Sequence, residues 1–494
     1  MAARSYRCRD MRRWDAIIVA VYLLRLVFIG FRLREKQSNL REYFVASSSM
    51  GWLIVGISII GSSTSTISYL SFPSEVIAHG PALLLANLAF PVSYLVVAYI
   101  FLPAYLKHNV TTIFEYLEVR FGVSVRMLGV MMFFVHRIIK LAFVVYTGAI
   151  AIRTVADFPM PAIILILGAV AIAYTTLGGV RADIIADTWE TTVLFLGGIA
   201  AIAVATYGAQ GIANVLKVVE SEGHVNLPII SYDTTSVIGV LIWAFLLDLV
   251  VFGSDQAILQ RAFCTKSLAD ARKSMLLNFV GSFVFEAMLC LIGFALFAYF
   301  RVHAGSFPGG LRQNSDQVFP YFISHYMPLG LSGLIIASLL AASMASLDSG
   351  INSSVAVFQI DVLGRFSRFQ RYQDSVWLAR TLSLIVGVLM TGAGCLLPLM
   401  HSNLLQTTGS IGGWLEGPLM AIFILGMVSK RLRGPAMIVG VAWGVVAGAL
   451  FSLSGRLFGL RTPSFTWIEP VSVSVVFVVT LLLNRLLARY PSGP

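Results

Sequence analysis

Small and hydroxyl side chains crowd residues 337–354, which read ASLLAASMASLDSGINSS inside an apolar stretch. Lipid offers these groups no partner, so at membrane depth they must face protein, water or a ligand. The small residues allow another helix to approach closely, and serine oxygens are hard ligands that suit a small cation. A packed helix whose serines bond back to their own backbone is the alternative. The carboxylate of Asp348 favours a cation site.

A second hydroxyl-rich segment, residues 58–68, predicts a broken helix. Gly61 is followed by five consecutive hydroxyl residues, which compete for backbone hydrogen bonds and are poor helix formers. A break there would free carbonyls to bind a cation near the bilayer midplane. The alternative is an ordinary Ser/Thr packing face. Five helices later, polar residues at 248–256 interrupt another apolar run. The two breaks stand at corresponding positions of two five-helix halves of the chain. This arrangement predicts a binding site between the two broken helices.

These segments require a membrane to position them. Apolar residues make up 57% of the chain and charged residues 12%, whereas soluble domains average about 25% charged residues. Apolar runs predict an all-α polytopic membrane protein with about thirteen transmembrane helices and no room for a soluble catalytic domain. The runs lie at 15–32, 51–72, 81–105, 125–152, 160–178, 184–207, 236–254, 275–300, 330–361, 376–397, 403–428, 433–454 and 469–488.

The net charge of +11 is distributed in a way that predicts topology. Arginines and lysines gather in alternate loops, which the positive-inside rule places in the cytoplasm, with the N-terminus outside and the C-terminus inside. The arginines before the first apolar run oppose this orientation. The basic loops carry Arg32, Arg34, Lys36 and Arg41; Arg261, Lys266, Arg272 and Lys273; Arg365, Arg368 and Arg371; and Lys430, Arg431 and Arg433.

Four motifs together resemble the sodium:solute symporter family, which includes sodium-coupled sugar, proline, iodide, monocarboxylate and sialic acid transporters. Residues 111–122 (TTIFEYLEVRFG) are similar to the loop motif after the family's second core helix. Residues 174–187 carry its Gly-Gly turn and fifth-helix aspartate. Residues 255–261 (DQAILQR) match its Asp-Gln-x-x-x-Gln-Arg stretch, and 346–353 (SLDSGINS) match its eighth-helix signature. The motifs occur in the family's order and span almost the whole chain.

The resemblance implies an architecture, an activity and partners. It implies one transmembrane domain over 1–494 with a LeuT-like five-plus-five inverted repeat: an extra helix and loop at 1–50, repeats at 51–208 and 235–430, and two helices at 431–494. The implied activity is sodium-coupled secondary active transport by alternating access, in the plasma membrane or a bacterial inner membrane. The implied partners are a small-molecule substrate, sodium as coupling ion with no other cofactor, and the lipid bilayer. A monomeric unit that binds no nucleic acid is expected.

The resemblance also implies a main sodium site. Matched by motif, backbone oxygens come from Gly61 and Thr64, and the eighth helix contributes Ala342, Ala345 and Ser346. Many family members carry a hydroxyl at the position of Ala345, and alanine cannot supply that ligand. Sodium prefers about five or six oxygens, by analogy with other hard cations. We therefore expect a weakened sodium site, with proton coupling as the alternative.

Some family members have a second ion site, built from the fifth-helix aspartate and eighth-helix serines. It maps to Asp187, Asp348 and Ser349. An intramembrane aspartate is costly enough that function is the default interpretation. Asp348 also has a structural alternative, in which it caps or bonds a neighbouring helix. Glu190 stands one turn after Asp187, where the family usually has glutamine, and is a candidate proton carrier.

In this family, substrates lie against the broken helix and contact the second, third and sixth core helices. Arg137 suits a carboxylate on the substrate, because its planar fork binds both oxygens. The alternative is that Arg137 pairs with a carboxylate of the protein, such as Asp248 or Glu286. Asp248 disfavours an anion unless it is paired or protonated. An organic acid such as sialic acid or a monocarboxylate, then a sugar, then an amino acid stay open as substrates, in that order. The matched positions are Ser63, Ser65, Ser68, Asn87, Arg137, Asp248 and Phe252.

Two other classes of protein are the alternatives to a transporter. An enzyme is disfavoured because the sequence has no His-Glu-x-x-His, no Gly-x-Ser-x-Gly and no paired metal ligands on one helix. A substrate sensor that binds without transporting would share the features above. Purified protein that binds a ligand without moving it would identify the sensor.

Overall fold

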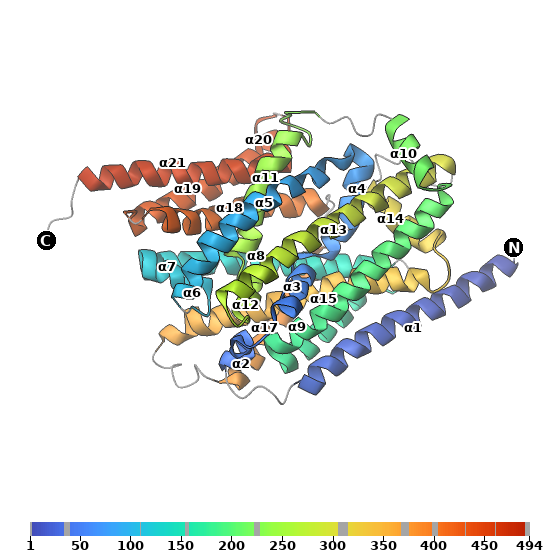
Figure 1. Ribbon diagram of the computed structural model, residues 1–494, viewed down its shortest axis with the longest axis horizontal. Helices are drawn as coiled ribbons and strands as arrows, with labels where there is room; N and C mark the ends of the chain where they lie inside the picture. The colour runs from blue at the N-terminus through green and yellow to red at the C-terminus, as the bar shows by residue number, and fades with distance from the viewer. Residues whose placement is uncertain are drawn as a thin grey trace.

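The computed structural model forms a bundle of helices (Figure 1). It describes residues 2–33, 40–108, 110–153, 158–221, 228–304, 315–366, 375–397, 404–429, 431–459 and 461–489. Within these ranges, 11 helices are long and apolar enough to cross a membrane, and up to 12 if one bent pair counts as a span. The chain is therefore an all-α, multi-span membrane protein.

The helices follow one another along the whole of the described chain. Their bounds are α1 (Ala2–Leu33), α2 (Leu40–Val45), η2 (Ala46–Ser48), α3 (Trp52–Ser63), α4 (Thr66–His79), η3 (Pro81–Ala89), α5 (Phe90–Val96), η4 (Val97–Phe101), α6 (Leu102–Lys107), α7 (Ile113–Phe121), α8 (Val123–Arg153), α9 (Met160–Gly208), α10 (Ile212–Ser221), α11 (Val237–Leu249), η5 (Val250–Ser254), α12 (Gln256–Phe263), α13 (Leu268–Val302), α14 (Ser315–His325), α15 (Leu331–Val357), η6 (Phe358–Val362), η7 (Leu363–Arg365), α17 (Val376–Gly394), α18 (Leu404–Val428), α19 (Gly434–Ser452), α20 (Ser454–Phe458), η9 (Phe465–Trp467) and α21 (Ile468–Arg489).

The predicted runs at 160–178 and 184–207 are two helical segments that meet at a kink at Gly179 and together carry the label α9. α9 has 49 residues, and its backbone leaves the helical region at Gly179 (φ 57°, ψ −175°). A helix of this length measures about 74 Å, whereas the hydrocarbon core of a bilayer is about 30 Å thick. Each half of α9 is therefore long enough to cross by itself. The prediction of about thirteen spans counted the two halves separately, and this difference accounts for the lower number.

The predicted break in the first core helix is confirmed. α3 ends at Ser63 and α4 begins at Thr66, and the two helices are bent by 63°. Between them Thr64 (φ −87°, ψ 144°) and Ser65 (φ −136°, ψ 161°) are extended. The side chain of Ser65 caps α4 by accepting a backbone N–H in its first turn. The hydroxyl residues that end one helix thus also begin the next.

The predicted interruption of the sixth core helix is also confirmed. α11 passes into the π-helical turn η5, and a new helix, α12, starts at Gln256. Asp255 is extended (φ −90°, ψ 118°), and its carboxylate accepts the backbone N–H of Ala257 at 2.8 Å. The chain therefore breaks at Asp255, and the break turns this carboxylate towards α8.

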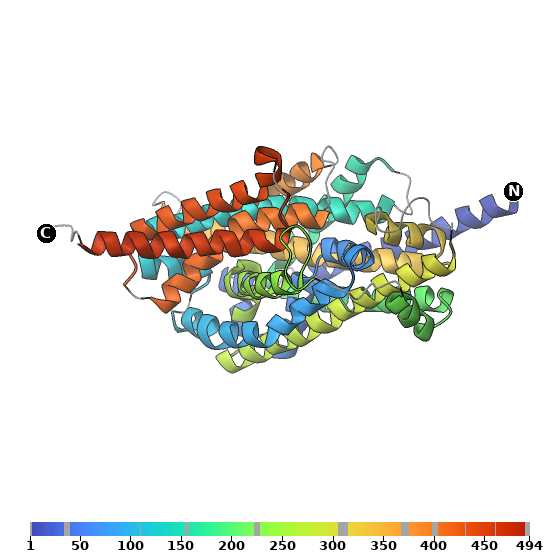
Figure 2. The same ribbon diagram turned by 90° about the horizontal axis from the view of Figure 1, so that it is seen from above.

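Helix α15 forms the centre of the bundle. Every residue from Ile335 to Val357 is buried, and α15 packs against α1, α8 and α9. Figure 1 shows α1 along one edge of the bundle and α21 at the opposite edge. Figure 2 shows α18, α19 and α21 side by side. The polar segment 337–354 therefore faces protein rather than lipid.

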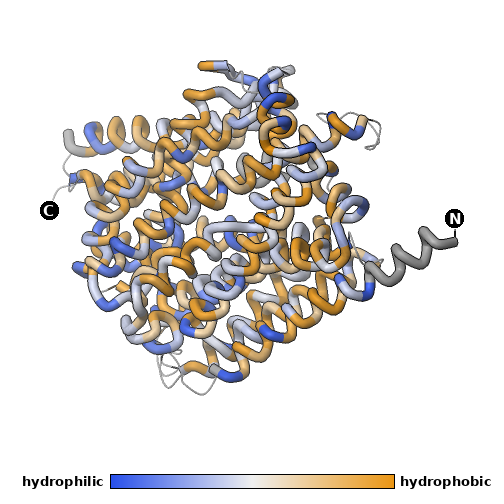
Figure 3. The backbone as a smooth tube through the Cα atoms, turned by 45° about the vertical axis from the view of Figure 1, so that its right-hand side comes forward, coloured by the Kyte–Doolittle hydropathy of each residue, from blue (hydrophilic) through white to orange (hydrophobic). Residues whose placement is uncertain are grey.

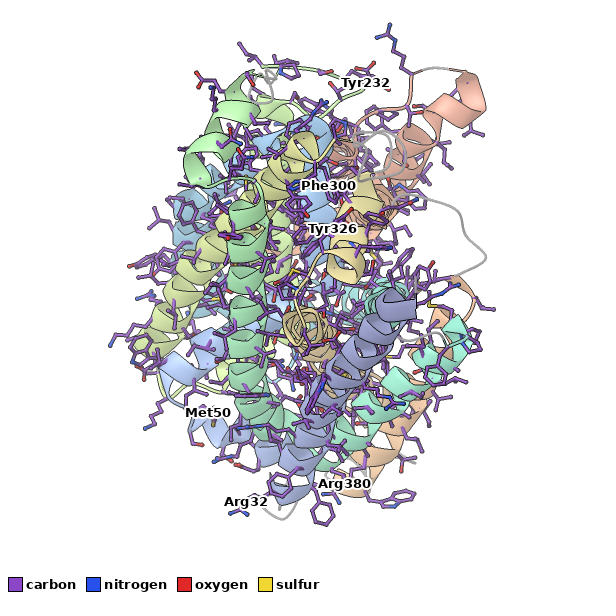
Figure 4. All side chains as sticks on the ribbon, turned by 90° about the vertical axis from the view of Figure 1, so that its right-hand side faces the viewer. Arg32, Met50, Tyr232, Phe300, Tyr326 and Arg380 are labelled. Atoms are coloured by element: carbon purple, nitrogen blue, oxygen red, sulfur yellow. The ribbon has the colours of Figure 1, made fainter. Side chains whose placement is uncertain are left out.

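The two ends of the bundle differ in the residues that they present. Apolar positions run along most of the helices between these ends (Figure 3). Figure 4 shows Arg32, Met50 and Arg380 at one end and Tyr232, Phe300 and Tyr326 at the other. Met50 donates its N–H to the carbonyl of Cys264 at 2.9 Å, so the basic loops near residues 41 and 266 share an end. The orientation given by the positive-inside rule stays a prediction, and Arg34, Lys36, Arg368, Arg371 and Lys430 lie outside the described residues.

Close packing between α9 and α15 depends on Gly197. A Cβ at Gly197 would lie 2.3 Å from the hydroxyl oxygen of Ser338 and 2.5 Å from its Cβ. We expect Gly197→Ala to lower the stability of the purified protein by about 1–3 kcal/mol, because overpacking forces the helices apart. Gly392→Ala is the control, since nothing lies within 4 Å of a Cβ there, and it should stabilise by about 0.5–1 kcal/mol. Equal thermal melting of the two variants would contradict this crossing.

Candidate ion and substrate sites

The break between α3 and α4 contacts α15 where the sequence predicts the main sodium site. The hydroxyl of Ser346 donates to the carbonyl oxygen of Thr64 at 2.8 Å. Gly61 lies beside Ala345, since a Cβ at Gly61 would be 3.7 Å from the Cβ of Ala345. The structure therefore brings Thr64 beside Ser346 and Gly61 beside Ala345.

The oxygens at this contact come mostly from the backbone. Ala342 and Ala345 are fully buried and offer only their carbonyls. The carbonyl of Gly61 accepts the hydroxyl of Thr64 at 2.9 Å. Ser346 is thus the predicted eighth-helix ligand that brings a side-chain oxygen. Carbonyl and hydroxyl oxygens are hard ligands, so the set suits a small cation.

Adding a hydroxyl at position 345 tests this assignment. We expect Ala345→Ser to lower the sodium concentration that gives half-maximal uptake by roughly tenfold, because one more oxygen faces the ion. Ala341→Ser, one turn earlier on the same buried face of α15, is the control and should leave that concentration unchanged. Sodium dependence that does not change in Ala345→Ser would argue against a ligand position at 345.

An arginine holds Asp187, a predicted ligand of the second ion site. The Nη2 and Nε atoms of Arg261 donate to Oδ2 of Asp187 at 3.0 and 3.1 Å. The hydroxyl of Ser58 donates to the same oxygen. Both charged side chains are buried, with 1% of Arg261 and none of Asp187 exposed. The aspartate is therefore neutralised within the protein through this oxygen.

Asp348 and Ser349 meet the same arginine from α15. Oδ1 of Asp348 lies 3.8 Å from Nη2 of Arg261 and accepts the N–H of Ser349 at 2.5 Å. The hydroxyl of Ser349 lies 2.9 Å from that of Ser62 on α3. The three residues predicted for the second ion site are thus neighbours, with Arg261 among them.

Glu190 joins this cluster. Asp187, Glu190 and Asp348 are buried, and each offers a carboxylate oxygen within 4.8 Å of the others. Among the described residues, one oxygen of each has no hydrogen-bond partner. Tyr22 of α1 donates to the other oxygen of Glu190 at 3.3 Å. Three carboxylates around Arg261 leave excess negative charge in a buried region, which favours a bound cation.

Long-range hydrogen bonds join the four sequence motifs into one polar network. The amide of Gln256 donates to the carbonyl of Thr111 at 3.1 Å, which joins the third motif to the first. Arg261 joins the third motif to the second through Asp187. Asn352 in the fourth motif donates to Asp183 in the second. The motifs therefore join segments that lie far apart in the sequence.

A cavity of about 290 Å³ adjoins the helix break. Its walls come from α3, α4, α8, α11 and α13, among others, and they include Ser346 and Ser349 of the ion sites. Asn87 does not line the cavity but donates to Glu286, which does, at 2.8 Å. The remaining predicted substrate residues line it: Ser63, Ser65, Ser68, Arg137, Asp248 and Phe252.

Arg137 pairs with Asp255, and not with Asp248 or Glu286 as the sequence alternative had it. The break at Asp255 turns its carboxylate towards α8, which explains the pairing. The Nε atom of Arg137 is buried and has no hydrogen-bond partner. Lys140, one turn later, lies 3.9 Å from Asp255 and is 34% exposed. The basic side of the cavity is thus already partly neutralised.

The sequence analysis missed several acidic residues of the cavity. Glu416 lies 3.0 Å from His136, and Glu469 is buried at the start of α21. Asp255, Glu286, Glu416 and Glu469 all line the cavity, yet none was predicted to bind substrate. A signal was available, because a carboxylate inside an apolar run is functional by default.

The fold and these sites define a membrane transporter with broken helices around a central cavity. The profile of the sodium:solute symporter family matches residues 43–448. The chain belongs to this family and is a transporter rather than an enzyme.

Individual relatives support the same assignment. The chain is 26% identical to the sodium/sialic acid symporter NanT of Aliivibrio fischeri, over 86% of this chain and 85% of the relative. It is 27% identical to the human sodium-coupled monocarboxylate transporter 2, over 93% and 75%. The solved structure of a Na⁺-coupled sialic acid symporter, in a substrate-bound outward-open state with a novel Na⁺ site, has a TM-score of 0.87 at 22% identity. The likeness covers 96% of this chain and 97% of that one. This neighbour confirms the LeuT-like fold.

Proposed function

We propose that the chain is a sodium-coupled symporter of a small polar organic solute, and that it works by alternating access. Organic acids such as sialic acid or a monocarboxylate are favoured, and a sugar is next. Membership of the family supports coupling to sodium. The relatives named for sialic acid and monocarboxylates support an acid as the solute.

The observation that carries this proposal is the continuity of the ion site with the cavity. Thr64 and Ser346 are joined by a hydrogen bond at the main ion site, and both residues line the cavity. A cation held there would fix the position of the cavity wall. Sodium would then raise the affinity for the solute, and the solute would raise the affinity for sodium by the same factor. Both sites lie within one chain, which supports a monomeric functional unit.

Two basic groups support a carboxylate on the solute. Lys140 lines the cavity and is 34% exposed. The buried Nε atom of Arg137, also a lining residue, has a hydrogen to donate. Guanidinium and ammonium groups are the usual partners of carboxylates in proteins.

Proton coupling is the second candidate. It is favoured by the cluster of Asp187, Glu190 and Asp348, in which three carboxylates have free oxygens around Arg261. Such a cluster has room to bind a proton in place of a metal cation. In this alternative the fold, the cavity and the class of solute are unchanged.

Uptake into proteoliposomes under separate gradients distinguishes the two candidates. Purified full chain is reconstituted, and labelled N-acetylneuraminate, pyruvate and glucose are offered with an inward sodium gradient alone or a pH gradient alone. We expect at least one acid to accumulate with sodium and to be competed by other acids. Accumulation that is driven by the pH gradient and does not depend on sodium would identify the proton as the coupling ion in place of sodium. Uptake of glucose that is not competed by acids would exclude an organic acid as the solute.

A further inference from the structure

We infer that the solute is a zwitterion, with its carboxylate at Lys140 and a positively charged nitrogen facing Asp248, Glu286 and Glu469. This inference rests on the proposed function as a symporter and names the class of solute. It follows from three features of the cavity: acids without basic partners, an excess of negative charge, and aromatic walls beside the acids.

The first feature is a group of carboxylates that no basic side chain neutralises. Asp248 and Glu469 are 6% and 3% exposed, and each keeps a carboxylate oxygen without a hydrogen-bond partner. Both line the cavity, as does Glu286, which accepts a bond from Asn87. In the part of the chain that the structure describes, none of the three acids has a lysine, arginine or histidine in ion-pair contact.

The second feature is the balance of charge across the whole cavity. The bases all come from α8, and each already lies within ion-pair distance of an acid: His136 of Glu416, Arg137 of Asp255, and Lys140 of both acids at 3.9 Å. Acids outnumber bases even if the histidine is protonated, so a plain anion would add to the excess. A solute with a cationic nitrogen would offset it, because buried charge needs a partner. The lining acids are Asp248, Asp255, Glu286, Glu416 and Glu469, and the lining bases are His136, Arg137 and Lys140.

The third feature is the aromatic wall around these acids. Trp243 and Phe252 flank Asp248 along the sixth core helix, and Phe285 precedes Glu286. All three aromatic residues line the cavity. Aromatic faces attract cations, and they favour an alkylated ammonium over a hydroxyl group.

Isosteric pairs of solutes test the inference directly. L-alanine and L-lactate differ only in an ammonium or hydroxyl group, and betaine and tert-butylacetate differ only in a charged nitrogen or a neutral carbon. Full-length protein in proteoliposomes is given an inward sodium gradient and each labelled solute in turn. We expect the zwitterion of at least one pair to be taken up at least about tenfold faster than its isostere, as charge-assisted contacts predict.

Two variants assign this preference to the acids. Asp248→Asn and Glu469→Gln keep the size of the side chain but remove its charge, and each should reduce the zwitterion preference to less than about threefold. Asp233→Asn and Glu220→Gln are matched controls, because both carboxylates lie outside the cavity lining, and they should keep the full preference. Thermal melting of each purified protein with the same solutes shows whether a variant still folds and binds.

The outcomes separate this inference from the proposed function. Sodium-driven uptake that is equal within each pair, or faster for the anionic isostere, would overturn the zwitterion and leave the symporter standing. Stabilisation by the zwitterion of a pair without sodium-driven uptake would keep the zwitterion and contradict the symporter. A preference that survives in both Asp248→Asn and Glu469→Gln would overturn the assignment to these acids.

Discussion

Replacing Arg261 with methionine is expected to abolish uptake and to lower the free energy of unfolding by about 3–5 kcal/mol. Arg261 is 1% exposed, donates twice to Asp187 and lies 3.8 Å from Asp348. It also donates to the hydroxyl of Ser58 on α3 at 2.9 Å. Without it, the cluster that includes Glu190 consists of buried carboxylates with no positive charge among them. Removing one partner of a buried ion pair costs far more than the pair itself contributes.

The effect of Arg261→Met is measured by thermal melting and by uptake in proteoliposomes. Arg461→Met is the control, because Arg461 is 83% exposed in its pair with Asp233 and exposed pairs contribute about 0–1 kcal/mol. Adding Asp187→Asn to Arg261→Met should recover part of the lost stability, since it removes one of the stranded charges. A melting temperature unchanged by Arg261→Met would contradict the buried network.

Ser346→Ala is expected to raise the sodium concentration for half-maximal uptake by roughly tenfold or more. Among the predicted eighth-helix ligands, Ser346 brings the side-chain oxygen, and it bonds the carbonyl of Thr64 at 2.8 Å. The variant removes this oxygen and also loosens the contact between the break and α15. Because the cavity shares these residues, affinity for the solute should fall together with affinity for sodium.

Ser343→Ala is the matched control for this variant. Ser343 lies on the same buried helix, but its hydroxyl donates to the carbonyl of Val144 on α8 at 3.0 Å, away from the break. Its loss should change stability slightly and leave sodium dependence as it is. If both variants shifted the sodium dependence equally, the position of the ion at Ser346 would be wrong.

Local features of the sequence predicted most of the fold. Apolar runs located the spans, and the hydroxyl residues after Gly61 predicted the break, because both effects act between near neighbours. The apolar runs also predicted the two halves of α9, which meet at Gly179, where the backbone leaves the helical region (φ 57°, ψ −175°).

The ligand positions were predictable only through the family motifs, and the pairings between them were not. Arg261 and Asp187 are 74 residues apart, and Tyr22 and Glu190 are 168 apart. No local pattern reports which of several buried acids a given arginine meets. Arg137 is an example, because its partner Asp255 lies at a break in another helix. For the same reason, the sequence did not show that the acids of the cavity line one site, although each is a carboxylate within or next to an apolar run.

The central claim is that a sodium ion bound between the helix break and α15 moves together with the solute. The most direct measurement is the influx of radioactive sodium into proteoliposomes that contain the purified full chain, with and without a transported solute outside. We predict that the solute accelerates sodium influx in a fixed ratio to its own uptake, and that Ser346→Ala removes the acceleration. Solute uptake that leaves sodium influx unchanged in the unmodified protein would contradict the account.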